Sequence, residues 1–197
     1  MAKRKRDPLG STLDLLGEAG VLKSVRRSGW WMIGMKNAES VADHSFRAAL
    51  LGYVLAKMEN VDPYPVVMMS LTNDLHEARI NDLHKVGHRY IDFPAAEKKA
   101  SAEQLAGLPA HVGEDLQRWS MELSGLTSRA GHIARDADIL ECMIQGKEYA
   151  DRGNTRAIDW MRRPAHLLRT KSAKKLAVRL RTWKSDDWWQ HLVTLAR

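Results

Sequence analysis

The 197-residue chain is long enough to bury one sizeable core, and its 44% hydrophobic and 28% charged residues are typical of a globular domain. Its single cysteine, Cys142, excludes an internal disulfide, and its longest apolar run, residues 48–56, is too short to span a bilayer. We therefore expect a cytoplasmic protein without a membrane contact. The net charge of +7 comes from residues 3–6 and 161–184, which leaves an acidic central body suited to a metal site.

Helical periodicity runs through most of the chain, and there is no sustained alternation of the kind found in strands. We therefore predict an all-α fold of about eight helices. Ser40 is a suitable cap for a helix that ends near Met58. The side chains of this helix expected to face inward are Val41, Phe46, Leu50, Tyr53 and Val54. The segments with helical periodicity are residues 11–19, 40–58, 66–79, 95–106, 112–123, 128–151, 155–169, 172–181 and 186–196.

Polar residues interrupt the apolar start of the predicted helix 66–79. After VVMMSL come Asn73, Asp74, His76 and Glu77, and their spacings of three and four place acidic side chains on one side of a helix. Acids that continue a buried stripe need a partner, because an unpaired buried charge is costly. That partner can be a metal ion, or the side chain of an arginine or lysine.

Two further apolar helices carry similar residues. His44 follows Asp43 in the helix after Ser40, and Asp136 and Asp138 lie within HIARDADILECMI. Each residue taken alone is better explained as a satisfied core residue or a surface position. Taken together, three helices that each bring a His, Asp or Asn toward the core suit a divalent metal. Composition alone leaves both interpretations open. Such ligands suit Mn, Fe, Co, Ni or Zn, and several carboxylates can also bind Mg.

Three segments of the chain have a recognisable pattern. RSGWWMIGMKNAESVADHSFRAAL contains Arg-x-Gly-Trp and then Glu-Ser-Val-Ala-Asp-His-Ser, NDLHEARINDLHKVGHRY contains Asp-x-x-Glu-Ala, and RDADILECMIQGKEY contains Ala-Asp-x-Leu with a later Glu-Tyr. In order and spacing, over about residues 11–152, these segments resemble the HD-domain phosphohydrolases, in the branch of small 5′-deoxynucleotidases. The resemblance implies a helical bundle that uses one divalent metal ion to remove phosphate from a nucleotide or another phosphate ester.

The resemblance also implies roles for individual residues. Glu77 matches the acid that assists the attacking water, and Asp82 matches an acid near the sugar. Arg27 matches a basic residue near the phosphate, and Trp30 is a possible wall of the nucleotide pocket. Because family members are often homodimers, the resemblance further implies a second copy of the chain as a partner. The implied metal ligands are His44, Asn73, Asp74 and Asp138.

Asn73 departs from the family pattern, which has a histidine at this position. An amide oxygen is a weaker ligand than an imidazole nitrogen for most transition metals. In a first interpretation the metal binds through the other three ligands with weak help from Asn73, and in a second His76 replaces the missing histidine. In a third the protein is a catalytically impaired member that binds a nucleotide or a partner.

The two basic ends lie outside the matching segments. We expect a basic arm at residues 1–10, an HD-domain core at residues 11–160, and a basic helical extension at residues 161–197 packed on the core. The basic residues of 161–184, with Trp160 and Trp183 nearby, also leave a nucleic-acid contact open, although no recognised RNA-binding motif is present.

Overall fold

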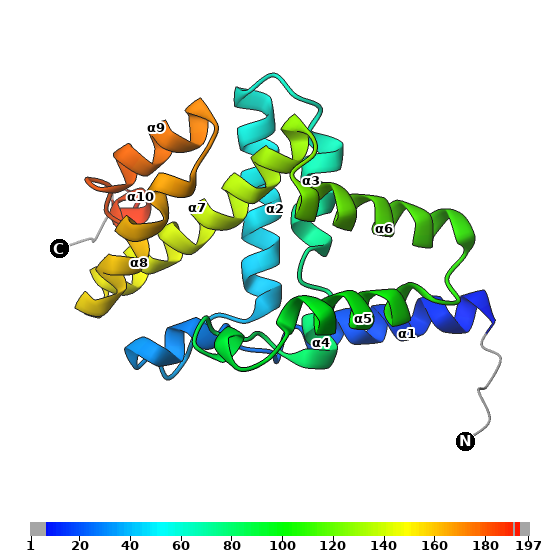
Figure 1. Cartoon of the computed structure of the whole chain (residues 1–197). Helices are drawn as coiled ribbons and strands as arrows, with labels where there is room; N and C mark the ends of the chain where they lie inside the picture. Colours follow the sequence, from blue (N-terminus) through cyan, green and yellow to red (C-terminus); the bar gives the residue numbers. More distant parts are fainter. Residues whose placement is uncertain (1–6, 191, 194–197) are drawn as a thin grey trace.

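The computed structural model describes residues 7–190 and 192–193, and its regular elements over these residues are helices (Figure 1). An isolated antiparallel bridge joins Arg26 and Ser40. The prediction of an all-α fold is confirmed. The longer elements are α1 (Pro8–Val21), α2 (Val41–Met58), α3 (Pro63–Thr72), α5 (Phe93–Leu105), α6 (Ala110–Gly125), α7 (Arg129–Asp151) and α9 (Lys171–Leu180). The short elements are η1 (Ser28–Ile33), α4 (Glu77–Ile80), η2 (Gly87–Arg89), η3 (Thr155–Ala157), α8 (Ile158–Arg162), η4 (Arg163–Leu167) and α10 (Asp187–Gln190).

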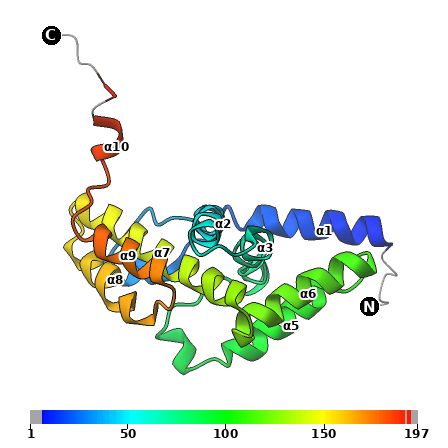
Figure 2. The same ribbon diagram turned by 90° about the horizontal axis from the view of Figure 1, so that it is seen from above.

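Helices α2, α3 and α7 pack against one another at the centre of the bundle. In Figure 1 the long α7 crosses α2, and Figure 2 shows α3 beside α2 when the molecule is seen from above. Their buried side chains form one hydrophobic core, which includes Leu55, Val66, Met69, Ile133 and Leu140. Because removal of apolar surface from water is the main driving force for packing, this core fixes the helices that carry the predicted polar residues.

Helix α2 begins where the sequence predicts. The Ser40 hydroxyl accepts a hydrogen bond from the Asp43 amide (3.1 Å), and the Asp43 carboxylate accepts one from the Ser40 amide (2.8 Å). This capping box satisfies two backbone donors that the first turn leaves unpaired. It therefore fixes the start of α2 one residue after Ser40, and it places His44 in the first turn.

The prediction for the inward face of α2 is wrong except at Val41. Phe46, Leu50, Tyr53 and Val54 are 70%, 55%, 47% and 40% exposed. Small residues face the core instead, and Gly52 shows why. A Cβ atom at Gly52 would lie 3.1 Å from both the Ser70 hydroxyl and a Val66 methyl group. Close packing of α2 on α3 at Gly52 therefore requires a small residue, and four of the large apolar side chains of α2 lie outside while Leu55 remains in the core.

The predicted helix 66–79 is two elements with turns between them. α3 starts earlier, at Pro63, and ends at Thr72, and α4 begins at Glu77. In these turns backbone amides donate to the carbonyl three residues earlier: the Leu75 amide to the Thr72 carbonyl (3.4 Å) and the Glu77 amide to the Asp74 carbonyl (3.0 Å). This tighter path turns the side chains relative to an α-helix.

The chain after α7 forms short helices that join the main core. η3, α8 and η4 replace the single helix predicted over residues 155–169, and Met161, Leu168 and Leu180 are buried in the core formed by α2, α3 and α7. The last predicted helix, 186–196, is α10 alone in the described residues. Residues 1–6, 191 and 194–197 lie outside them. Across the part of the chain that the structure describes, no helix is long and apolar enough to cross a membrane.

Candidate active site

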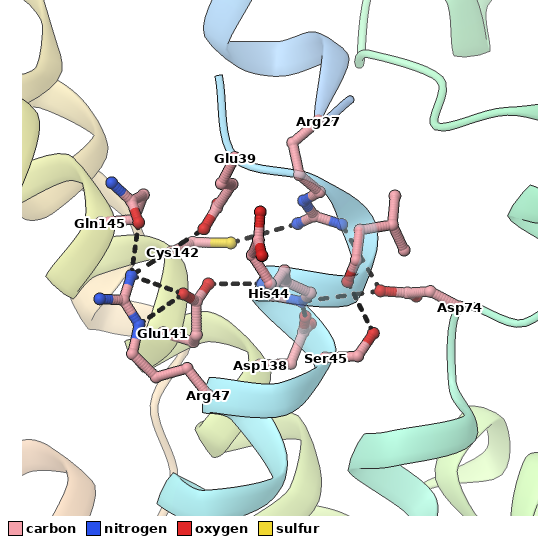
Figure 3. Close-up of polar contacts among 12 residues, drawn as sticks. Arg27, Glu39, His44, Ser45, Arg47, Asp74, Asp138, Glu141, Cys142 and Gln145 are labelled. Carbon is pink, nitrogen blue, oxygen red and sulfur yellow. Dashed lines mark hydrogen bonds and ion pairs between the residues drawn. The ribbon is translucent and has the colours of Figure 1, made fainter. Parts of the chain in front are cut away.

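His44 lies where α2, α7 and the turn after α3 meet. Its side chain is buried, and Nε2 lies 3.1 Å from Asp138 Oδ1 and 3.6 Å from Asp74 Oδ2 (Figure 3). Each of the three side chains comes from a different part of the chain, so only the folded bundle brings them together. The structure thus gathers His44, Asp74 and Asp138 at one point.

The other ring nitrogen of His44 contacts a second acid, Glu141. Nδ1 makes a short hydrogen bond with Glu141 Oε2, and Arg47 Nε donates to Glu141 Oε1 (2.9 Å) (Figure 3). Burial opposes ionisation of Glu141, but His44 and Arg47 outweigh it and hold the pKa of this carboxyl below its usual range. Because a carboxylate has no proton to donate, Nδ1 must be the donor in this hydrogen bond.

The Nε2 side of the ring therefore faces two acceptors. Burial and Arg27 oppose a positive charge on His44, yet Glu141 and Asp138 outweigh them and raise its pKa. Burial likewise opposes ionisation of Asp138, but His44, Arg27 and Arg135 hold its pKa below the usual range. An imidazole nitrogen between two carboxylates needs a positive charge beside it, either a proton or a metal cation.

Arg27 contacts the same oxygen of Asp74 as His44 does. Its NH1 group lies 3.6 Å from Asp74 Oδ2 and 3.2 Å from Asp82 Oδ2. Asp82 is also held through Oδ1, which accepts hydrogen bonds from the amide (2.8 Å) and the hydroxyl (2.6 Å) of Ser28. Arg27 and Asp82 are thus fixed relative to each other at the start of η1.

Glu77 is buried in the first turn of α4. Among the described residues, its Oε2 atom has no hydrogen-bond partner. Burial, with added repulsion from Asp74 and Asp82, raises the pKa of Glu77 to about 9. A buried carboxyl oxygen without a protein partner is unusual in a folded protein, so Glu77 is a candidate functional group.

Asn73, which stands at the position of the family histidine, and His76, its possible replacement as a metal ligand, differ in their contacts. Asn73 is half-buried, and its amide donates to Asp74 Oδ1 (2.7 Å). His76 is buried, and its ring packs edge-on against Phe93, with ring centroids 6.0 Å apart. Both line the cavity described next, so the structure keeps both near Asp74.

A cavity of about 320 Å³ lies over this group of acids. Trp30 is on its wall but is almost wholly buried, and its Nε1 donates to Glu39 (2.9 Å). Trp160 of α8 packs on Trp30 with ring centroids 4.8 Å apart. A Cβ atom at Gly29 would lie 2.7 Å from the Trp160 ring, so only glycine allows this close approach. The lining residues include Arg27, Trp30, Asn73, Asp74, His76, Glu77, Asp82, Asp138 and Trp160, with His84, Lys85, His88 and Arg135 adding positive or titratable groups.

A family model described as the HD domain matches residues 19–176 of the chain. The chain belongs to the HD-domain family. The match begins at residue 19 in α1 and ends at residue 176 in α9, so it starts after residue 11 but extends beyond residue 152 into the predicted C-terminal extension. The sequence-based prediction of an HD-domain phosphohydrolase is confirmed.

Curated HD-domain relatives are named as enzymes. The 5′-deoxynucleotidase HDDC2 of Dictyostelium discoideum is 28% identical over 151 residues, which cover 72% of this chain and 78% of the relative. The human protein of the same name is 27% identical over 146 residues, which cover 72% of this chain and 69% of the relative. The alternative of a catalytically impaired binder has no support in these comparisons.

Solved structures show the same fold. A conserved hypothetical protein from Pyrococcus furiosus is 29% identical, covers 87% of this chain and 99% of its own, and superposes with a TM-score of 0.73. The HD phosphohydrolase DatZ of cyanophage S-2L, whose structure is described with bound dA and one catalytic Zn²⁺ ion, superposes with a TM-score of 0.52. It is 16% identical and covers 84% of this chain and 92% of its own, so it supports the fold alone.

The HD-domain family implies a divalent metal, and the side chains at the meeting point of the helices fit one. His44 offers Nε2, because Nδ1 is used by Glu141, and Asp74 and Asp138 offer carboxylate oxygens on the same side. A cation there would replace the proton that His44 otherwise holds between two acids. This mixed nitrogen and oxygen set suits a transition metal and agrees with the metal dependence of HD phosphohydrolases.

A second group of possible ligands, made of His44, Glu141 and Cys142, is less suitable. Arg47 already occupies one oxygen of Glu141, and Arg27 NH2 lies 3.3 Å from the Cys142 sulfur. Burial raises the pKa of the Cys142 thiol to about 12, so the thiolate that a metal requires is disfavoured. The positive charges of both arginines further oppose a cation at this group.

Sequence reasoning missed Glu141, Arg47 and Trp160 as site residues. Glu141 could have been found, because it is an acid inside the apolar string ILECMI and lies three residues after Asp138. Arg47 had no signal of its own, since a single arginine in a helix usually faces solvent. Trp160 comes from a different block of the sequence and reaches the cavity only because α8 packs beside η1.

Proposed function

We propose that this HD-domain protein is a cytoplasmic, divalent-metal-dependent phosphohydrolase that removes phosphate from a nucleotide, with a deoxynucleotide as the first candidate substrate. The observation that carries the proposal is the meeting of His44, Asp74 and Asp138 at a cavity that also holds the unpartnered carboxyl of Glu77. The mixed nitrogen and oxygen ligands suit Mn, Co, Fe, Ni, Zn or Mg. When bound, it would supply a positive charge that activates water and neutralises phosphoryl oxygens.

The chain's own side chains would arrange the reactants. His44, Asp74 and Asp138 would hold the metal, with Asn73 as a weak fourth ligand. Glu77 would orient the attacking water through its free oxygen, which lies in the same cavity. A cation bound beside Asp74 would favour the ionised form of Glu77, so that its carboxylate could take up the proton. Positioning of both reactants before the reaction removes much of the entropic cost of bringing them together.

The phosphate and nucleoside would occupy the other walls of the cavity. Arg27 would bind the phosphate through its fork of donors, exchanging its contacts with Asp74 and Asp82 for phosphate oxygens. Asp82 would accept a hydrogen bond from a sugar hydroxyl. Trp30 would form part of the nucleoside wall from a buried position, with Trp160 as the more open aromatic surface beside it.

A screen of phosphate release tests this function. We would assay 5′-mononucleotides, nucleoside triphosphates and simple phosphate esters with Mn²⁺, Co²⁺, Zn²⁺ and Mg²⁺, and use Asp138→Asn as the inactive control. We expect phosphate from at least one nucleotide in a metal-dependent manner. No release from any substrate with any of the four metals would contradict the proposal.

We also propose that the protein is a homodimer, as the exposed side of α2 supports. Phe46, Leu50 and Tyr53 lie four and three residues apart, so they form one exposed apolar stripe. A stripe of this kind is typical of a protein interface. Light scattering should show a dimer in the wild-type protein and a monomer in Leu50→Lys. Val178→Lys, at an exposed apolar position on α9, is the matched control and should remain dimeric.

For the domain organisation, we propose that residues 11–160 form the HD-domain core and that the basic segment 161–197 is an extension whose described residues pack on it. The predicted basic arm, residues 1–10, lies outside the described residues up to residue 6, and its residues 8–10 begin α1. The burial of Leu168, Ala173 and Leu180 in the central core supports this close packing. A nucleic-acid contact through residues 161–184 remains a prediction from charge alone. A steep fall of any such affinity with added salt is the measurement that checks it.

A further inference from the structure

Behind the candidate metal site, His44, Glu141 and Arg47 form a continuous chain of contacts (Figure 3). His44 Nδ1 contacts one oxygen of Glu141. Arg47 Nε donates to the other oxygen (2.9 Å), and Arg47 NH2 lies 2.7 Å from it. His44 and Glu141 are fully buried and lie on α2 and α7, two of the helices that pack most closely. Both oxygens of Glu141 are therefore used, one toward the site and one away from it.

Arg47 is itself held in place at the far end of this chain. Its NH2 group donates to Gln145 Oε1 (2.6 Å), and its NH1 group donates to Glu148 Oε1 (2.7 Å). Gln145 and Glu148 lie one and two turns after Glu141 on α7. Arg47 thus spans two turns of α7, and its guanidinium fork leaves little freedom for the Glu141 carboxylate.

We propose that Glu141, held by Arg47, is a positioning residue that fixes the His44 ring with Nδ1 as the donor, so that Nε2 faces Asp74 and Asp138 as a metal ligand. The inference rests on the proposed function, because the metal is what Nε2 would bind. A carboxylate behind a ligating imidazole fixes its tautomer and ring orientation and increases its basicity. Glu141 touches neither the metal nor the substrate and acts through His44.

Stability alone is a poor reason for this arrangement. Removing three ionisable groups from water is costly, and well-packed apolar residues of similar volume often stabilise a protein as well as a buried ion pair does. Asp136 offers a contrast on the same helix. It is equally buried, but backbone amides of Arg169 and Thr170 satisfy it, and it has no contact with His44. Asp136 is therefore the matched control for a buried α7 carboxylate outside the site.

The first test measures metal affinity by calorimetric titration of the full-length protein with Mn²⁺ and Zn²⁺. In Glu141→Gln a single acceptor oxygen must serve both His44 and Arg47, so one contact is lost. We expect metal affinity to fall roughly 10–100-fold, the usual effect of losing a partner behind a ligand. Asp136→Asn should melt at a lower temperature but bind metal within about twofold of the wild-type protein. Equal metal affinity in Glu141→Gln and wild-type protein would overturn the proposal.

A variant at Arg47 separates positioning from direct ligation by Glu141. If Glu141 only orients His44, Arg47→Met loosens the carboxylate and weakens metal binding by a smaller factor than Glu141→Gln. If Glu141 were itself a metal ligand, removal of a competing cation would leave metal binding equal or tighter. An equal or tighter affinity in Arg47→Met therefore rejects the positioning role. Arg47 is half-buried at the surface, so this variant also serves if Glu141→Gln does not fold.

A third measurement needs neither metal nor activity. Nitrogen NMR of histidine-labelled, metal-free protein, assigned with His44→Ala, reports which ring nitrogen carries the proton. We expect a protonated Nδ1 in the wild-type protein at alkaline pH, where the ring is neutral, and a mixture of tautomers in Glu141→Gln. Neutral His44 protonated at Nε2 in the wild-type protein would overturn the proposal.

The outcomes also separate this inference from the proposed function. Wild-type protein that binds metal but hydrolyses no phosphate ester would contradict the function, while loss of metal affinity in Glu141→Gln would still support positioning. Normal hydrolysis with unchanged metal affinity in Glu141→Gln would contradict positioning alone. Wild-type protein that binds none of the metals would overturn both.

Discussion

Helix α7 contributes to two buried acidic regions that differ in how their charges are satisfied. Asp136 accepts hydrogen bonds from the Arg169 amide (2.9 and 3.1 Å) and the Thr170 amide (2.7 Å), so it holds the segment before α9 against the core. Two residues later, Asp138 faces His44 and Arg135, and the acids Asp74, Glu77 and Asp82 lie nearby. One helix thus supplies an acid for structure and an acid for a site.

The difference lies in the partners. Both carboxylate oxygens of Asp136 accept hydrogen bonds from backbone amides, which are fixed parts of the fold. This region therefore contributes to stability. At the site, acids face one another, and one Glu77 oxygen has no hydrogen-bond partner among the described residues. Proteins maintain such unfavourable arrangements mainly where a ligand or a reaction needs them. Substitutions should therefore affect chemistry in one region and stability in the other.

The largest expected effect belongs to Glu77→Ala. We expect hydrolysis to fall at least about 100-fold, the usual contribution of a positioned proton acceptor, while metal affinity stays near that of the wild-type protein. The free energy of unfolding should not decrease, because the substitution removes a buried carboxyl that lacks a partner. Steady-state phosphate release, calorimetric metal titration and denaturant unfolding together check this. Near-normal turnover in Glu77→Ala would refute the role.

Asn73→His should have the next largest effect. It restores an imidazole beside Asp74, and we expect metal affinity to rise by roughly 10–100-fold, with higher turnover at limiting metal. Wild-type activity should accordingly depend on added metal. Titrations of both forms with Mn²⁺, Co²⁺ and Zn²⁺ measure the difference. If both forms bind metal equally tightly, another residue replaces the missing histidine. His76→Ala then tests His76: metal affinity should fall in this single variant and recover in the double variant with Asn73→His if His76 is that residue.

The sequence was sufficient to predict the long helices α2 and α7 and three residues that meet at the site, His44, Asp74 and Asp138. Caps such as Ser40 and Ser128 mark helix starts through local hydrogen bonds, so α2 and α7 begin where predicted. The site residues were found because acids in apolar helices are conspicuous and because three segments match a known pattern. Each of these segments is short and continuous in the sequence, so it can be recognised without knowledge of the fold.

The parts that could not be predicted depend on packing between distant segments. The inward face of α2 follows from close contact of Gly52 with α3, which no local periodicity reveals. Asp136 and Asp138 look alike in the sequence, yet the backbone of Arg169 and Thr170 decides that Asp136 is structural. The break after Thr72 similarly reflects how the turn carrying Asp74 approaches His44 rather than any helix-breaking residue in the string.

Asp136→Ala tests the structural acid of α7, where we expect an effect on stability and none on metal binding. The substitution leaves the backbone amides of Arg169 and Thr170 without their acceptor. A hydrogen bond to a charged group contributes about 1.5–3 kcal/mol to stability. We expect the free energy of unfolding to fall by about that amount, with unchanged metal affinity. Chemical denaturation followed by circular dichroism measures the first quantity and calorimetry the second. A variant as stable as the wild-type protein would show that Asp136 is dispensable for anchoring the C-terminal segment.

The smallest effect concerns Glu59, a second acid, which anchors the first turn of α9. Glu59 Oε1 accepts a hydrogen bond from the Ser172 amide (2.8 Å), and this bond, with help from Arg129, lowers the pKa of Glu59 below the ordinary value of 4.5. A carboxyl with a lowered folded-state pKa contributes stability above its unfolded-state value and loses it as pH falls through the folded-state value. The melting temperature of Glu59→Gln should therefore lie slightly below that of the wild-type protein at pH 7, and the gap should narrow as the pH falls below 4.5. The effect should be small, because the paired cation Arg129 is exposed to solvent and ion pairs at the surface contribute little. A gap that widens in acid would contradict a stabilising contribution from the ionised form of Glu59.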